Sequence, residues 1–200
     1  VHIADMDSLS YIVSEIPDTA KKLALEFWPG PLTMIMKKSE RVPYETTGGL
    51  DTVAVRMPVN SIAMEFIRAA GGYIAAPSAN TSGRPSCTTA EHVIEDLNGK
   101  IEMIIDGGPV GIGIESTIID LTGNTPCLLR PGYINIEMLR KVLGTVSIDP
   151  AIEGTLPDGT HPKAPGMKYK HYAPKGELYI VKGSQDAVIQ KINELVYENE

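Results

Sequence analysis

A short apolar strand runs directly into a polar loop in Tyr73-Ile74-Ala75-Ala76-Pro77-Ser78-Ala79-Asn80-Thr81-Ser82-Gly83-Arg84-Pro85-Ser86. In open α/β sheets, ligands gather at the carboxyl ends of strands, where loop amides and hydroxyl groups can converge on phosphate oxygens. The loop at residues 77–86 therefore predicts a phosphate-binding site. An ordinary polar turn is the alternative, because the spacing matches no standard phosphate loop of the Gly-Lys-Ser/Thr type.

Helices and strands alternate irregularly on both sides of this loop. Short apolar runs bounded by turn residues predict buried strands at 32–36, 52–57, 73–75, 103–105, 116–121 and 127–130. Apolar spacing and capping residues predict helices that begin at Asp7 or Ser8, at Asp18, at Ser61, at the Thr88–Glu91 capping box and after Asn135. Some strands follow one another without an intervening helix, so we expect an α+β fold with a twisted mixed sheet flanked by helices.

The chain changes character after residue 143. Prolines at 150, 157, 162, 165 and 174 interrupt regular structure, which predicts a linker over 144–175. A strand at 178–181 and a helix capped by Ser184 follow. One strand and one helix cannot bury a core alone. We therefore expect a first domain over 1–143 and the start of a second α/β domain over 176–200.

Composition narrows the class of protein. The formal net charge of −7 argues against binding that depends on neutralising nucleic-acid phosphates. No apolar run approaches the ~20 residues that cross a bilayer, and no signal-peptide pattern is visible, so we expect a cytoplasmic protein without a membrane partner. Cys87, Cys127 and the four histidines have no metal-ligand spacing, and we expect no metal held by protein ligands alone.

Two arginines and a glycine-rich turn accompany the loop. Arg56 and Arg130 each end a predicted strand, where an anionic ligand or surface ion pairing would explain them equally well. The glycine-rich turn from Asp106 to Gly113 leads into Glu115-Ser116-Thr117. This turn either lets the backbone approach a ligand closely or forms a plain hairpin. With no nucleophile elbow in the sequence, we assign no catalytic side chain and expect catalysis by positioning and charge stabilisation.

These motifs together resemble the threonylcarbamoyl-AMP synthase family, in the long form that joins a YrdC-like catalytic domain to a C-terminal accessory domain. The segments that carry the resemblance occur in family order: 28–33, 53–58, 76–83, 106–109, 115–117 and 129–132. The run from Pro165 to Pro174 is similar to the interdomain signature of the long form.

The resemblance implies an enzyme, a nucleotidyltransferase that converts L-threonine, bicarbonate or CO2, and ATP into threonylcarbamoyl-AMP and pyrophosphate. Mg²⁺ would act through the phosphates. The product would pass to a threonylcarbamoyl-transferase machinery that modifies adenosine 37 of tRNA, so that tRNA is an indirect partner. Matched to the family motifs, the ATP contacts are Thr52, Ser78, Ser86, Arg130 and Tyr169, and the L-threonine contacts are His2, Arg56, Ala76 and Ser116.

The sequence also departs from the family pattern. The family carries a strand and a basic segment before the position of His2, and their absence here leads us to expect a truncated chain that is inactive alone. Cys87 stands where many relatives have proline. Two alternatives stay open: an RNA-binding or regulatory YrdC-like module, and a carbamoyl-transfer domain of the hydrogenase-maturation type.

Overall fold

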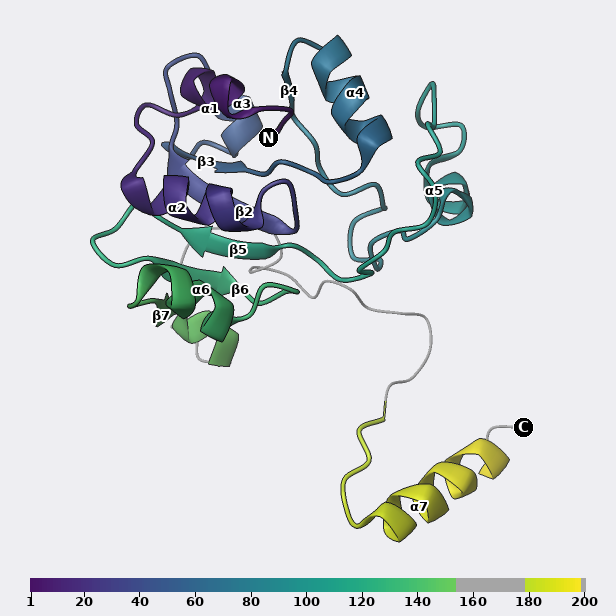
Figure 1. Ribbon diagram of the computed structural model, residues 1–200. Coiled ribbons are helices and arrows are strands. Elements are labelled where there is room, and N and C mark those ends of the chain that lie inside the picture. Colours follow the sequence, from purple (N-terminus) through teal and green to yellow (C-terminus); the bar gives the residue numbers. More distant parts are fainter. Residues whose placement is uncertain (154–178, 199–200) are drawn as a thin grey trace.

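The computed structural model describes residues 1–153 and 179–198, and Figure 1 shows their arrangement. A five-stranded sheet lies at the centre in the order β3-β2-β5-β6-β7. Its strands are β2 (Leu32–Lys37), β3 (Thr52–Val55), β5 (Thr117–Asp120), β6 (Cys127–Arg130) and β7 (Ser147–Ile148). β2 runs parallel to β5 and antiparallel to β3, while β6 runs antiparallel to β5 and parallel to β7. The mixed sheet expected from the sequence is confirmed.

A second, two-stranded sheet joins β1 (His2–Ile3) to β4 (Tyr73–Ile74) in antiparallel register. An isolated bridge between His2 and Arg56 connects this small sheet to the end of β3. The backbone N–H of Ile3 donates to the carbonyl of Arg56 at 3.0 Å. β4 therefore leads into the polar loop from a position beside the central sheet.

Helices flank the strands, and several of them begin at a capping side chain. They are α1 (Met6–Ile12), α2 (Asp18–Phe27), α3 (Tyr44–Thr47), α4 (Ser61–Ala69), α5 (Ala90–Leu97) and α6 (Ile136–Leu143), with a 3-10 turn η1 (Pro150–Glu153). Asn135 caps α6 as predicted, since its Oδ1 accepts from the N–H of Met138 at 2.9 Å. The cap of α1 was predicted wrongly: Asp5 accepts from the N–H of Ser8 at 2.7 Å.

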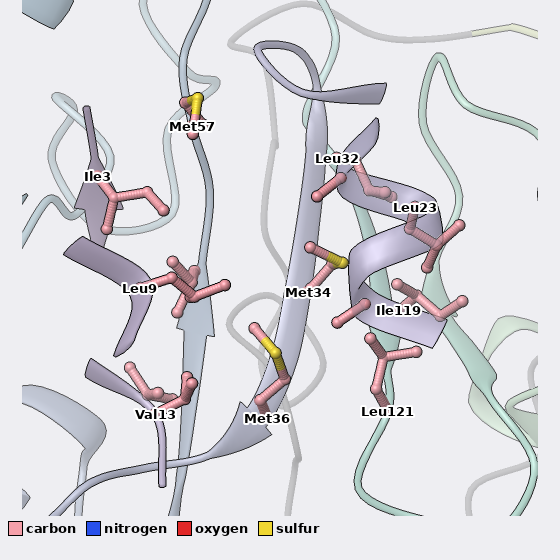
Figure 2. Packing of buried hydrophobic residues seen from close by; sticks show 14 of the residues in the cluster. Ile3, Leu9, Val13, Leu23, Leu32, Met34, Met36, Met57, Ile119 and Leu121 are labelled. Atoms are coloured by element: carbon pink, nitrogen blue, oxygen red, sulfur yellow. The ribbon is translucent and has the colours of Figure 1, made fainter. Parts of the chain in front are cut away.

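The core lies on one face of the central sheet. Leu32, Met34 and Met36 alternate along β2 toward this face and pack with Leu23 of α2 and Ile119 of β5 (Figure 2). Full burial of each such side chain contributes roughly 1.5–3 kcal/mol. On the opposite face the buried cluster is much smaller, namely Ile35, Ile118 and Leu129. Because residues alternate along the strands, Arg56 lies in register with this second face.

Three expected elements differ from the structure. Residues 103–105 form no strand, since no neighbouring strand pairs with them and the side chains of Met103 and Ile105 stay exposed. Residues 179–181 also form no strand, although the predicted helix after Ser184 is present as α7 (Gln185–Glu198), whose described side chains are not buried. Within the expected linker, β7 adds a strand to the central sheet, and η1 follows it to residue 153. The domain boundaries remain predictions.

Candidate functional site

A cavity of about 720 Å³ opens where the end of the central sheet meets the polar loop. Its walls are the strand-end residues Pro31, Arg56 and Ser116, the loop residues Ser78 and 85–88, and the turn 108–115, with Pro58 to Asn60 at the rim. In Figure 1 the residues from 75 to 116, which we call the loop segment, extend from β4 past α5 to the start of β5. The cavity is thus built half from the sheet and half from the loop segment.

Strand direction brings the two arginines to the same edge of the sheet. β3 and β6 both run antiparallel to the parallel pair β2 and β5, so their carboxyl ends meet the amino ends of that pair. Arg56 follows β3 and Arg130 ends β6. Burial lowers the pKa of Arg56, while the nearby carboxylate of Glu115 raises it and the guanidinium of Arg130 lowers it. Two neighbouring, partly buried cations favour an anionic ligand at this edge.

Hydrogen bonds fix both guanidinium groups before any ligand binds. Arg56 donates through Nε to the carbonyl of Gly30 at 3.0 Å. Arg130 donates through Nε to the carbonyl of Ser116 at 3.0 Å and through Nη2 to Ser116 Oγ at 3.1 Å. Ser116 Oγ also lies 2.8 Å from Thr33 Oγ1. Side chains held in this way lose little entropy on binding, so the edge is preorganised.

Glu115 connects the sheet edge to the loop segment. One of its carboxylate oxygens lies 3.4 Å from Arg130 Nη2. The other accepts a hydrogen bond from the Ser86 hydroxyl. Among the described residues that line the cavity, Glu115 supplies the one carboxylate. The arrangement places a negative charge between two side chains that are suited to bind an anion.

The polar loop is held by a buried carboxylate. Asp96 of α5 is 6% exposed, accepts from the backbone N–H of Thr81 at 3.1 Å and forms an ion pair with Arg84. Asn80 donates through Nδ2 to the carbonyls of Thr81 and Arg84 at 2.9 and 3.2 Å, and its buried Oδ1 has no partner among the described residues. These contacts fix the loop backbone while Ser78 stays exposed.

The glycine-rich turn is fastened to α4. Asn60 caps this helix, since its Oδ1 accepts from Ala63 N at 3.0 Å, and its Nδ2 donates to the carbonyl of Gly107 at 3.1 Å. Asp106 Oδ1 accepts from the N–H of Gly108 at 2.8 Å, and Gly108 has a φ of 81° that favours glycine. The exposed side chains of Val110, Ile112 and Ile114 then give the cavity an apolar wall.

Gly132 makes room for the start of β5. A Cβ atom at this position would lie 2.5 Å from the carbonyl oxygen of Glu115 and 2.7 Å from the backbone nitrogen of Thr117. The Thr117 hydroxyl, fully buried, donates to the carbonyl of Ile134 at 2.7 Å. The connection from β6 to α6 therefore positions the backbone that carries Ser116.

His2 lies beside the arginine edge through its bridge to Arg56. Burial lowers the pKa of His2 to about 4, and the charges of Arg56 and of the Val1 amino group add to this effect. The imidazole is therefore neutral at pH 7, so it acts as a hydrogen-bonding group and adds no further positive charge.

The structure brings together most of the residues predicted from the sequence. Arg56, Ser78, Ser86 and Ser116 line the cavity, and Arg130 contacts Ser116 directly. Ala76 is exposed between β4 and the loop. Thr52 begins β3, whereas Arg56 follows its other end, and Thr52 is not among the residues that line this cavity. Tyr169 falls outside the described residues.

The sequence analysis missed two members of the site. Thr33 received no role as the last residue of the segment 28–33, yet its hydroxyl contacts Ser116 across adjacent strands. Glu115 was quoted within Glu115-Ser116-Thr117 but received no role. The position of Glu115 between a glycine-rich turn and a strand was the available signal, because such junctions aim side chains at ligands.

The donor set suits a divalent cation that arrives with phosphates. No group of three or more His, Cys, Asp or Glu side chains among residues 1–153 and 179–198 can hold a metal ion. Mg²⁺ commonly binds through one or two carboxylates together with substrate phosphates. Glu115 could serve as such a carboxylate, so the residues present fit a nucleotide-bound cation.

Within the same described ranges, no helix has the length and apolar character needed to span a membrane.

The fold and cavity define a mixed-sheet domain with a preorganised anion-binding edge. Residues 1–132 match the family model Sua5_yciO_yrdC, described as "Telomere recombination", and residues 134–200 match Sua5_C, described as "Threonylcarbamoyl-AMP synthase, C-terminal domain". The chain belongs to the Sua5/YciO/YrdC family.

Named relatives agree with this assignment. Over 98% of its length the chain is 55% identical to threonylcarbamoyl-AMP synthase of Pyrococcus abyssi, and over 97% it is 46% identical to the Bacillus subtilis protein of that name. It spans 57% and 56% of these relatives. The crystal structure of P. abyssi Sua5 complexed with L-threonine superposes with a TM-score of 0.90 at 54% identity, covering 98% of this chain and 57% of that one.

Proposed function

We propose that the chain contributes the substrate-binding site of an L-threonylcarbamoyladenylate synthase. The observation that carries this proposal is that Arg56 and Ser116 line a cavity whose other wall includes the polar loop, while Arg130 is hydrogen-bonded to Ser116 beside them. A site for two anions, a carboxylate and a polyphosphate, needs two fixed cations at one edge. The names of the relatives, and the threonine in the P. abyssi complex, support this choice of ligands.

The reaction divides between the two walls of the cavity. The threonine amine captures CO2 as a carbamate, whose oxygen attacks the α-phosphorus of ATP while pyrophosphate leaves. Arg56, Ser116, His2 and Ala76 would hold L-threonine. Ser78, Ser86 and Arg130 would hold ATP, together with Thr52, which lies outside the lining of this cavity, and Tyr169, which falls outside the described residues. Because both cationic side chains are fixed beforehand, they can stabilise charge on the pentavalent phosphorus without further reorganisation.

Mg²⁺ would withdraw charge from the phosphates when it is bound with ATP. We further propose that the threonylcarbamoyl group is consumed by a transferase acting on tRNA, and that the reaction takes place in the cytoplasm. The acidic net charge of −7 fits an enzyme that acts on small molecules and meets tRNA only indirectly.

The test measures pyrophosphate release together with calorimetric binding of L-threonine and ATP. In a protein that spans the full length of the relatives, release should require both L-threonine and bicarbonate. Arg56→Ala should weaken L-threonine binding by roughly tenfold to a hundredfold, because a charge-assisted hydrogen bond to a carboxylate is lost, and should affect ATP less. Arg68→Ala removes an exposed arginine of α4 that pairs with Glu65 and is the matched control. Release that is indifferent to threonine would contradict the proposal.

A further inference from the structure

Glu115 occupies the place between Arg130 and Ser86 that the proposed function gives to phosphate oxygens. Its two carboxylate oxygens contact Arg130 Nη2 and the Ser86 hydroxyl separately. The side chain is 30% exposed, so the charge is reached by both solvent and ligand. A carboxylate placed in this way imitates an anionic ligand, and an incoming phosphate meets it at close range.

Two consequences follow from simple electrostatics. Without a cation, the carboxylate competes with phosphate for Arg130 and Ser86 and repels it, and at short range such repulsion is substantial. With Mg²⁺, the same carboxylate can bind the cation that the phosphates carry, since Mg²⁺ accepts one carboxylate together with substrate oxygens. Glu115 therefore weakens nucleotide binding in the absence of Mg²⁺ and strengthens it in the presence of Mg²⁺.

We propose that Glu115 is the positioning residue that makes nucleotide binding at this cavity depend on a divalent cation. The inference rests on the proposed function, because it takes ATP as the ligand. It requires that Glu115 leave Arg130 and Ser86 when phosphate arrives and turn toward the cation. The side chain lies at the junction of the loop segment and β5 and is 30% exposed.

The contacts of the site separate this role from a purely structural one. Ser116 fixes Arg130 through two hydrogen bonds that do not involve Glu115. Asp96 holds the loop through Thr81 and Arg84, again without Glu115. Neutralising Glu115 should therefore leave both walls in place and change the charge alone.

The experiment compares ATP affinity in EDTA and in excess Mg²⁺ by calorimetry on the whole chain. For the wild type we expect ATP to bind at least about tenfold more weakly in EDTA, because the carboxylate repels the phosphates. Glu115→Gln should reduce this ratio to roughly threefold or less, with tighter binding in EDTA and weaker binding in Mg²⁺. Glu115→Asp keeps the charge and should keep the wild-type ratio.

Glu26→Gln, an exposed change on α2, is the matched control and should leave the ratio unchanged. Thermal melting establishes that each variant folds. If Glu115→Gln does not fold, Glu115→Ala supplies a second neutral side chain at this position. An unchanged ratio in the neutral variants overturns the inference, as does a Gln-like ratio in Glu115→Asp. Absence of ATP binding to the wild type in both buffers overturns the proposed function as well.

Discussion

The two walls of the cavity differ in how they are held. The sheet wall rests on an apolar core in which Leu23, Met34 and Ile119 are fully buried. In the loop segment, residues 75–116, the one buried residue is the carboxylate Asp96. Polar contacts are weaker and more local than apolar packing, so we infer that the sheet wall opens only with global unfolding and the loop segment opens by itself.

The largest expected effect tests the sheet wall. Leu23→Ala should lower the free energy of unfolding by about 4 kcal/mol, because it removes buried methyl groups and leaves a cavity. Denaturant titration measures the change. Leu25 lies on the same helix and is 89% exposed, so Leu25→Ala should cost less than about 0.5 kcal/mol. Equal effects of the two changes would mean that α2 does not cover the core.

Acid should weaken the junction between the two walls. The pKa of His2 in the folded chain is about 4, below the ordinary value near 6.5, so the folded state binds fewer protons than the unfolded state between these pH values. The contribution of His2 to stability is full above about pH 6.5 and is lost as the pH drops toward 4, by up to about 3 kcal/mol. Denaturant titrations across this range measure the loss.

The variant His2→Gln should remove most of this pH dependence, whereas His92→Gln, on the exposed face of α5, should retain it. A loss of similar size in His2→Gln and in the wild type would show that other groups are responsible.

The loop segment should respond locally. Asp96→Asn weakens the contacts to Thr81 and Arg84, and we expect the opening free energy of the loop to fall by about 2 kcal/mol, a value reduced for the 37% exposure of Arg84. Hydrogen exchange at the Thr81 amide should accelerate while the global free energy of unfolding stays nearly constant. Glu95→Gln, which affects a more exposed partner of Arg84, should accelerate it less. An equal loss of global stability would show that the segment unfolds with the sheet.

The smallest expected effect concerns the fastening of the glycine-rich turn. Asn60→Ala removes the cap of α4 and the hydrogen bond to Gly107, at a cost of about 1 kcal/mol. Asn60→Asp keeps the cap oxygen and loses the donor to Gly107, so it separates the two contributions. Exchange at the turn amides should rise in both variants, while the helix amides are protected in Asn60→Asp. Slow hydrogen exchange at the turn amides in both variants would show that Asn60 does not hold the turn in place.

Much of the fold could be predicted because its main strands are apolar runs. β2, β3, β5 and β6 all appear where such runs are bounded by turn residues. β1 and β7 have only two residues each, one of them polar, so that neither stands out as an apolar run in the way that the equally short β4 does. At residues 103–105 a strand was expected and none forms, because an apolar run forms a strand only where a partner strand lies beside it.

The site was predictable where a residue marks the end of a strand. Arg56 and Arg130 stood out because a cation at the end of an apolar run needs an explanation. The contact between Thr33 and Ser116 depends on the register of β2 against β5, across 83 positions of sequence. Glu115 bridges two residues that become neighbours only in the folded chain. Composition and spacing carry no information on either contact.

Gly132 shows how a residue without a functional group can behave as part of a binding site. Any side chain there must displace the backbone at Glu115 and Thr117, and with it the serine between them. In a survey of every substitution scored by ligand binding, Gly132 should therefore rank with Arg56. Substitutions at Gly132 would weaken binding because the connection after β6 must leave space for the backbone that positions Ser116.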